Sequence, residues 1–142
     1  MITIDASVLV AAGSPGDMAS QQSVQFLRAA LGAGLAVHQP TLTLVEVSAS
    51  IARRTNDPAL AREVGLQLLQ MPGLVLHPLD IEAAAEAAAI AGRAQLRGAD
   101  AIYAATALRH GTTLVTLDQE LLTRTAGIVD SVGPAEWLER RG

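Results

Sequence analysis

Cysteine is absent from this chain of 142 residues. Its absence excludes disulfide bridges, thiolate zinc sites, iron–sulfur clusters and cysteine nucleophiles. Lysine is absent as well, because all ten basic residues are arginine. Without lysine, the chain cannot bind phosphate through a P-loop, form a Schiff base, or pair an aspartate nucleophile with a lysine for phosphoryl transfer. The remaining chemistry must rest on carboxylates, hydroxyls, histidines and arginines.

Aromatic residues, charge and long apolar runs are also scarce. Only Phe26, Tyr103 and Trp137 are aromatic, although half of the residues are apolar, so we expect an aliphatic, alanine-rich core. No apolar run reaches the eighteen or so residues that a membrane span needs, and no basic segment precedes the strand-like Ile2-Thr3-Ile4. We therefore expect a cytoplasmic, soluble protein with no membrane partner. The net charge of −4 argues against generic polyanion binding, so an enzyme acting on nucleic acid would need metal ions or a local arginine patch.

Short apolar runs alternate with helical patterns along the whole chain. This alternation predicts an α/β fold with a mainly parallel sheet, in one domain spanning residues 1–142. We expect strands at residues 2–4, 35–38, 74–76, 113–117 and, more weakly, 128–132. We expect helices at about residues 17–32, 40–52, 57–71, 80–98 and 99–110, and a last one from Pro134.

Helix boundaries and faces follow from individual residues. Asp17, Asp57 and Asp80 are predicted N-caps, since aspartate accepts hydrogen bonds from the free amides of a first turn. Gly111 is the expected C-terminal stop of the helix that ends at residue 110. The helix that begins at Pro40 has one apolar face, formed by Leu42, Val45, Ala49 and Ala52.

Two aspartates directly follow predicted strands. Asp5 comes after Ile2-Thr3-Ile4, and Asp118 comes after Leu114-Val115-Thr116-Leu117. In an open parallel sheet, ligands bind beyond the carboxyl ends of the strands, at the point where the strand order reverses. If the first and fourth strands are neighbours there, both carboxylates enter one crevice. The ordinary alternative is helix capping, which applies to Asp5, to Asp118 and also to Asp100.

Two further acids lie on helices that carry little other charge. Glu46 lies within Leu44-Val45-Glu46-Val47, and Asp100 within Gly98-Ala99-Asp100-Ala101-Ile102. An ionised carboxylate among apolar neighbours is unfavourable unless a cation or hydrogen-bond donors meet it. For Glu46 the alternative is a contact with Arg53 along a polar stripe of the helix, formed by Thr43, Glu46, Ser50 and Arg53.

Capping alone does not explain the four acids together. Hard divalent ions such as Mg²⁺ and Mn²⁺ prefer oxygen ligands and typically bind a few carboxylates plus waters. Two such ions about 3.5–4 Å apart can activate a water and stabilise the leaving oxygen in phosphodiester cleavage. The set therefore predicts a metal centre that cleaves phosphodiesters.

These acids and their flanking motifs resemble the PIN domain (PilT N-terminal) and, more narrowly, the VapC-type toxins of type II toxin–antitoxin pairs. The motifs are Ile2-Thr3-Ile4-Asp5-Ala6-Ser7-Val8-Leu9, Leu44-Val45-Glu46-Val47, and the run from Arg97-Gly98-Ala99-Asp100 to Leu117-Asp118. They cover both ends and the centre of the chain. Leu121 is a departure, because many relatives carry an aromatic residue there; this touches packing only.

The resemblance implies a three-layer α/β/α sandwich with a five-stranded sheet in the order 3-2-1-4-5. It implies a Mg²⁺- or Mn²⁺-dependent endoribonuclease that hydrolyses RNA by metal-activated water. Asp5, Glu46, Asp100 and Asp118 would be both the catalytic residues and the metal ligands, with Ser7 and Thr116 supporting the acids. It also implies a homodimer held inactive by a cognate VapB-like antitoxin; apolar helix faces that could make such contacts could equally be core.

Arginines and histidines give weaker signals. Arg93 and Arg97, one helical turn apart, and Arg53-Arg54 are candidate phosphate contacts, although arginines near helix C-termini also complement the helix dipole. His38, His77 and His110 lie at predicted strand or helix ends, where we expect caps or surface residues. We therefore predict that metal-bound water acts without a histidine base.

Two other functions fit parts of this pattern. One is a non-catalytic PIN-like module that binds RNA or protein; the presence of all four acids favours the enzyme. The other is a metal-dependent phosphatase or general nuclease that has no antitoxin. Growth arrest on expression, relieved by Asp5→Asn, would separate the enzyme from the module, and the gene neighbourhood would separate a toxin from a general nuclease.

Overall fold

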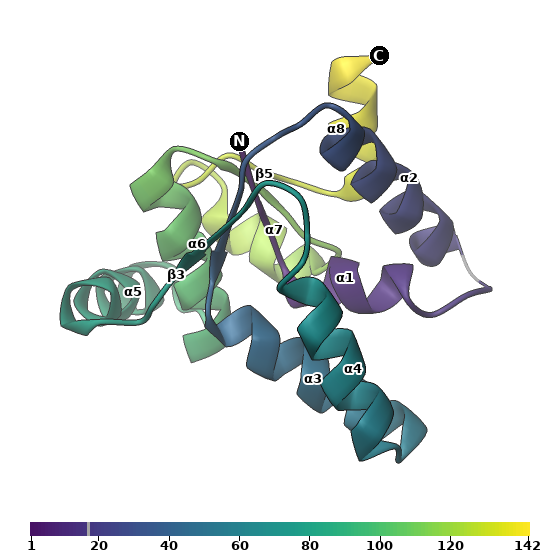
Figure 1. Cartoon of the computed structure of the whole chain (residues 1–142). Coiled ribbons are helices and arrows are strands. Elements are labelled where there is room, and N and C mark those ends of the chain that lie inside the picture. The colour runs from purple at the N-terminus through teal and green to yellow at the C-terminus, as the bar shows by residue number, and fades with distance from the viewer. Residues whose placement is uncertain (17) are drawn as a thin grey trace.

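The computed structural model describes residues 1–16 and 18–142 and contains a five-stranded, fully parallel sheet (Figure 1). The strand order is β3-β2-β1-β4-β5, which confirms the expected 3-2-1-4-5 topology and places β1 beside β4. The order reverses between these two neighbours, so the crevice lies where the sequence predicted it. The strands are β1 (Ile2–Ile4), β2 (Val37–Pro40), β3 (Leu74–His77), β4 (Thr113–Val115) and β5 (Ser131–Val132).

Helices cover both faces of the sheet and complete the three layers. They are α1 (Ala6–Ala12), α2 (Met18–Gly32), α3 (Leu42–Thr55), α4 (Pro58–Leu68), α5 (Ile81–Ala94), α6 (Gly98–His110), α7 (Gln119–Thr125) and α8 (Pro134–Arg141). Helices α2 and α8 lie together on one side of the molecule, while α3 and α4 form a pair that extends away from the sheet (Figure 1). No helix of the described residues has the length and apolar character needed to cross a bilayer.

Two apolar clusters separate these layers. Phe26 on α2 meets Trp137 on α8 edge to face, with ring centroids 4.9 Å apart, above buried residues of β1, β4 and β5. The opposite cluster is built largely from alanines of α6 together with residues of α3, α4 and α5. Leu121 is fully buried in this second cluster. The core is therefore aliphatic, as the composition predicted.

Several predicted caps are confirmed. The Asp57 carboxylate accepts a hydrogen bond from the Leu60 amide at the start of α4, and Asp80 accepts from the Ala83 amide at the start of α5. Gly111 ends α6 with φ 60°, in the left-handed region that favours glycine. The cap predicted at Asp17 lies outside the described residues.

The boundary between β2 and α3 was predicted wrongly. Pro40 is the last residue of β2 rather than the first of the helix, and the strand covers residues 37–40 instead of 35–38. A proline fits both places, because neither the end of a strand nor the first turn of a helix requires its missing amide hydrogen.

The buried face of α3 also differs from the prediction. Its buried residues are Thr43, Val47 and Ile51, whereas Val45 is 64% exposed. Helix α4 packs against a neighbouring side of α3, where Gly65 comes so close that an added Cβ would lie 2.6 Å from the Ser48 hydroxyl. Because apolar residues lie on more than one side of α3, periodicity alone could not identify the side that faces the core.

Candidate functional site

The carboxyl ends of β1 and β4 bring Asp5 and Asp118 to the same edge of the sheet. Residues Ile2, Thr3 and Ile4 pair in register with Thr113, Leu114 and Val115, so the two strands end side by side. The Asp5 amide donates to the carbonyl of Val115, which extends the pairing to the acid itself. Both aspartates therefore follow the carboxyl ends of neighbouring strands, as the sequence predicted.

Hydroxyl groups hold Asp5, which does not cap a helix through its side chain. Asp5 is only 6% exposed, and its Oδ2 accepts hydrogen bonds from Ser7 Oγ at 2.5 Å and Thr116 Oγ1 at 2.8 Å. It precedes α1, but its carboxylate accepts no hydrogen bond from a backbone amide of that helix's first turn. The capping alternative thus fails for Asp5, and Ser7 and Thr116 make the supporting contacts predicted for them.

Asp118 does cap a helix. Its Oδ1 accepts hydrogen bonds from the amides of Glu120 and Leu121 at the start of α7, at 2.9 and 3.2 Å. Its own amide donates to Thr116 Oγ1 at 3.0 Å, and the same hydroxyl donates to Asp5. Thr116 therefore links the two acid-bearing turns through one oxygen atom.

Two helices bring Glu46 and Asp100 toward the same place. Burial raises the pKa of the Glu46 carboxyl, and the charges of Asp5 and Asp100 raise it further, while the nearby Tyr103 hydroxyl acts in the opposite direction. Burial also raises the pKa of Asp100, and the charges of Asp5 and Asp118 add to this effect. The charges of Asp5 and Asp100 therefore reach Glu46, and those of Asp5 and Asp118 reach Asp100, although the four acids come from four separate segments.

A fifth acid, which the sequence analysis missed, joins this cluster. Glu120, two residues after Asp118 in the first turn of α7, also raises the pKa of Asp100. Its carboxylate pairs with Arg124 Nε at 2.9 Å on the same helix. The available signal was its spacing from Asp118, but an acid in a first turn is ordinarily explained by the helix dipole.

Negative charge in this cluster has little compensation from the protein. Among the described residues, none of Asp5, Glu46, Asp100 and Asp118 takes part in an ion pair, so the alternative contact between Glu46 and Arg53 is not made. Arg97, the N-cap residue of α6, does lower the pKa of Asp100. In the described part of the chain, no three of these acids have carboxylate oxygen atoms close enough together to bind one ion. An uncompensated group of oxygen donors suits divalent cations, whose charge would draw the side chains together.

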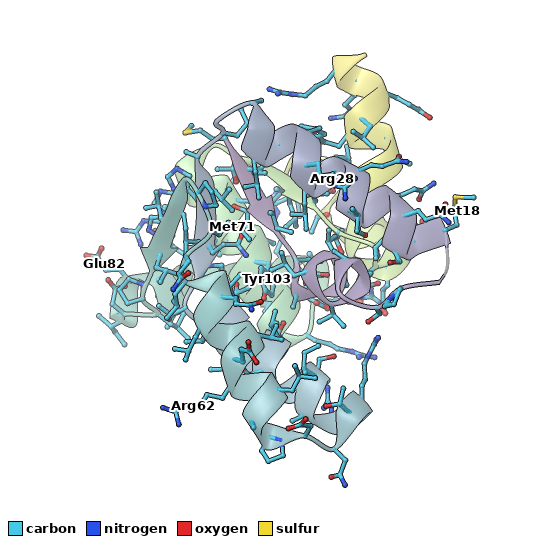
Figure 2. The ribbon with its side chains drawn as sticks, turned by 45° about the vertical axis from the view of Figure 1, so that its right-hand side comes forward. Met18, Arg28, Arg62, Met71, Glu82 and Tyr103 are labelled. Atoms are coloured by element: carbon cyan, nitrogen blue, oxygen red, sulfur yellow. The ribbon has the colours of Figure 1, made fainter. Side chains whose placement is uncertain are left out.

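The Tyr103 ring lies in the centre of the molecule (Figure 2), and its hydroxyl interacts with Glu46. Tyr103 is fully buried, and its hydroxyl lies near Thr43 and Glu46 without a hydrogen-bond partner of good geometry. Burial raises the pKa of this phenol far above its usual range, so the ring remains neutral.

Three arginines lie near the acids. Arg53 and Arg54, in the last turn of α3, line a groove of about 580 Å³ together with Glu46 and Ser7. The predicted pairing of Arg93 with Arg97 on one helix is wrong, because α5 ends at Ala94 and Gln95 adopts a left-handed conformation. Arg93 lines a separate groove between α5 and α6, whereas Arg97 lies near Asp100.

Raised carboxyl pKa values make the metal-free protein sensitive to pH. For Glu46 the folded-state pKa exceeds the unfolded value, so its ionisation opposes folding above both values. This destabilising effect of Glu46 ionisation disappears as the pH falls through the ordinary carboxyl range of about 4–5. In EDTA at pH 7 we therefore expect Glu46→Gln to unfold at a higher urea concentration than the wild type.

The pH dependence of that difference provides the check. Urea unfolding followed by Trp137 fluorescence should show the gain from Glu46→Gln shrinking from pH 7 toward pH ~4. Glu63→Gln, on the exposed side of α4, is the matched control and should leave the curve unchanged. A Glu46→Gln protein that is less stable than the wild type at pH 7 would contradict the expectation.

Comparisons with known proteins agree with the fold. The sequence pattern of the PIN domain family matches residues 2–128. A search of curated protein sequences finds no match. Solved structures with the same fold include FitAcB from Neisseria gonorrhoeae, at 23% identity over 95% of this chain and 99% of that one, with a TM-score of 0.71.

Two further solved structures show the same fold at lower identity. A VapC toxin of Mycobacterium tuberculosis, named as cleaving the sarcin–ricin loop, is 18% identical over 92% of this chain and 98% of that one, with a TM-score of 0.72. VapBC2 from Rickettsia felis, bound to promoter DNA, is 12% identical over 94% and 98%, with a TM-score of 0.70.

Proposed function

Because the chain belongs to the PIN domain family, we propose that it is a metal-dependent endoribonuclease and the toxin of a type II toxin–antitoxin pair. The observation that carries the proposal is the cluster of Asp5, Glu46, Asp100 and Asp118, four acids without ion-pair partners at the strand-order reversal. The names of the neighbouring structures support the toxin assignment, since they describe toxins and toxin–antitoxin complexes.

These four residues are the proposed ligands of Mg²⁺ or Mn²⁺. The oxygen donor set fits hard divalent ions, which would supply an activated water and stabilise the leaving oxygen of a phosphodiester. The chain's own residues hold the donors in place: Ser7 and Thr116 fix one oxygen of Asp5, and α7 fixes one oxygen of Asp118. In this proposal the histidines take no part in proton transfer.

RNA would approach along the groove that contains Glu46. Arg53 and Arg54 line this groove, and Arg97 lies near Asp100, so phosphates can be bound beside the acids despite the net charge of −4. Arg54 Nη1 already donates to the Ser14 hydroxyl at 3.2 Å, which orients its guanidinium along the groove. The antitoxin and a second copy of the chain are the proposed protein partners.

Metal dependence is the direct test of the enzyme. Purified protein freed of any antitoxin should cleave RNA in Mg²⁺ or Mn²⁺, EDTA should abolish cleavage, and restored metal should recover it. Mapping of RNA ends after induced expression should then identify the cut sites. RNA that is bound but remains intact with either ion would instead indicate the non-catalytic module.

A further inference from the structure

Three histidines from distant segments gather on the α6 side of the sheet. His38 lies on β2, His77 is the last residue of β3, and His110 is the last residue of α6. Nδ1 of His38 and Nε2 of His77 are 2.9 Å apart, and the rings of His77 and His110 stack with centroids 3.8 Å apart. All three side chains are half-buried, and these partly exposed residues, predicted to be caps or surface residues, contact one another.

We propose that His38, His77 and His110 form a binding site for one transition-metal ion of the zinc class. One ring nitrogen from each residue lies within 4.8 Å of the other two. Among the described residues, this is the one group of three potential ligands gathered at that spacing. Imidazole nitrogens favour Zn²⁺, Cu²⁺ and Ni²⁺, whereas Mg²⁺ and Mn²⁺ favour the oxygens of the acidic cluster.

The fold itself creates this meeting point. Strands β2 and β3 are parallel neighbours in which His38 pairs with Val75 and Pro40 pairs with His77. The two histidines are therefore only two positions out of register on adjacent strands. Helix α6 packs against β2, and His110 in its last turn lies next to the rings of His38 and His77.

Small side-chain movements would complete the site. Zinc–nitrogen bonds of 2.0–2.1 Å in a tetrahedron place ligand nitrogens about 3.3–3.4 Å apart. The His38–His77 pair must open slightly from 2.9 Å, and the wider pairs, at most 4.8 Å, must close. The stacked rings must also tilt, because the lone pair of an imidazole nitrogen lies in the plane of its ring. Half-exposed side chains can make such rotations without disturbing the core.

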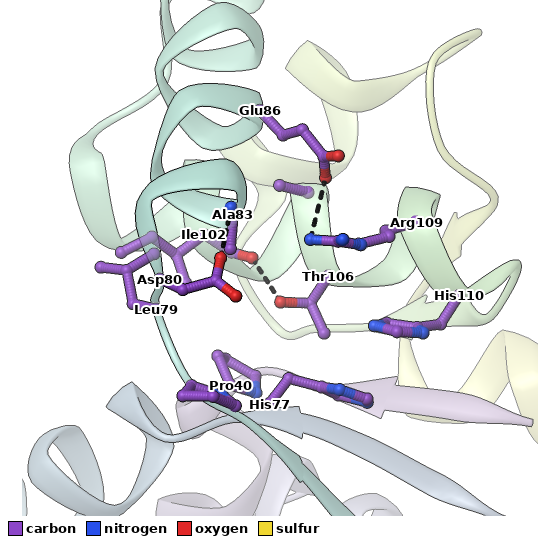
Figure 3. Close-up of a pocket in the computed structure, with 12 residues that line it drawn as sticks. Pro40, His77, Leu79, Asp80, Ala83, Glu86, Ile102, Thr106, Arg109 and His110 are labelled. Carbon is purple, nitrogen blue, oxygen red and sulfur yellow. Dashed lines mark hydrogen bonds and ion pairs between the residues drawn. The ribbon is translucent and has the colours of Figure 1, made fainter.

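The surroundings leave room for a fourth ligand. His77 and His110 lie side by side at the mouth of a cavity of about 210 Å³, which Asp80, Glu86 and Arg109 also line (Figure 3). Water can reach a bound ion from this cavity and fill the open position. The Arg109 charge would oppose a cation, but its guanidinium pairs with Glu82 at 3.4 Å and Glu86 at 3.8 Å.

This site is separate from the acidic cluster and does not depend on the proposed function. Asp100 and His110 lie in the first and last turns of α6, and a rise of 1.5 Å per residue separates them by about 15 Å along the helix axis. A bound ion would connect β2, β3 and the end of α6. It would therefore stabilise the sheet edge and the helix together.

Metal titration of the wild-type protein, prepared without a polyhistidine tag and stripped with EDTA, tests the site. We expect one equivalent of Zn²⁺ to bind by calorimetry, and one equivalent of Co²⁺ to give the visible absorption of a tetrahedral nitrogen site. At Zn²⁺ about 100-fold above Kd, the midpoint of thermal unfolding should rise by roughly 10 °C. Failure of the wild type to bind either ion saturably would overturn the proposal.

Variants identify which residues bind the ion. His77→Gln should weaken Zn²⁺ binding by more than about a hundredfold, since losing a direct ligand exceeds the loss of a supporting contact. The control is Asp5→Asn with Asp118→Asn, which alters the acidic cluster and should leave Zn²⁺ affinity unchanged. Binding that survives His77→Gln but is lost in the aspartate variant would place the ion on the carboxylates and refute the histidine site. Ring-nitrogen chemical shifts of the wild type, which should move for all three histidines, give the same answer if His77→Gln does not fold.

Discussion

Replacing Asp5 by asparagine should reduce RNA cleavage by about a thousandfold while leaving the chain folded. The substitution removes one negative charge from the proposed metal centre. It keeps a carbonyl oxygen that can still accept the hydrogen bonds of Ser7 and Thr116, so the turn after β1 retains its contacts. Initial rates of RNA cleavage in Mg²⁺ measure the first effect, and thermal unfolding followed by Trp137 fluorescence measures the second.

Two companion variants sharpen this result. Asp57→Asn is the matched control, because Asp57 caps α4 away from the acids and asparagine caps about equally well; both its rate and its stability should match the wild type. Asp118→Asn tests the acid that also caps a helix. Its cap should survive, so a large loss of rate at unchanged stability would separate a metal ligand from a cap. Cleavage at near wild-type rates by Asp5→Asn would rule out the proposed centre.

Gln39→Leu should lower the free energy of unfolding by about 2–4 kcal/mol. Gln39 is fully buried on β2, and its side chain takes the place of a strand partner for Ile4 on β1. Its Oε1 accepts from the Ile4 amide at 2.6 Å, and its Nε2 donates to the Ile4 carbonyl at 2.7 Å and to the Thr43 hydroxyl at 3.2 Å. Leucine would leave two buried backbone groups of Ile4 without partners, directly before Asp5.

Urea unfolding at pH 7 measures that loss. Gln21→Leu is the matched control, because Gln21 is exposed on α2, where the same substitution should change stability by less than about 0.5 kcal/mol. If Gln39→Leu also stayed within about 0.5 kcal/mol of the wild type, the amide bridge between β1 and β2 would be dispensable.

Much of the fold could be predicted from sequence because local patterns and global topology agree. Apolar runs ending in Asp5 and Asp118 identified two strands, and the caps at Asp57, Asp80 and Gly111 placed helix ends correctly. Prediction failed where one residue type fits two structures. Pro40 suits the end of a strand as well as the start of a helix, and a helix with apolar residues on more than one side, such as α3, does not reveal its buried side.

The candidate site was predictable in part for a related reason. An acid among apolar residues is conspicuous in a sequence, so Glu46 and Asp100 could be selected one by one. Glu120 could not, because it follows the ordinary rule for the first turn of a helix. Nor could the histidine cluster, since His38, His77 and His110 are separated by more than thirty positions and only the pairing of β2 with β3 and the packing of α6 bring them together.

The family pattern stops at residue 128, yet the hydrophobic interior continues past it. Strand β5 hydrogen-bonds β4 along the outer edge of the sheet, and Val132 is fully buried. Trp137 on α8 covers the face of the sheet beside Phe26. A chain shortened to residues 2–128 would lack β5 and α8. It would lose the edge strand of the sheet, and the Phe26 side chain, which Trp137 covers, would be exposed to water. The hydrophobic core thus extends beyond the part of the sequence that identifies the family.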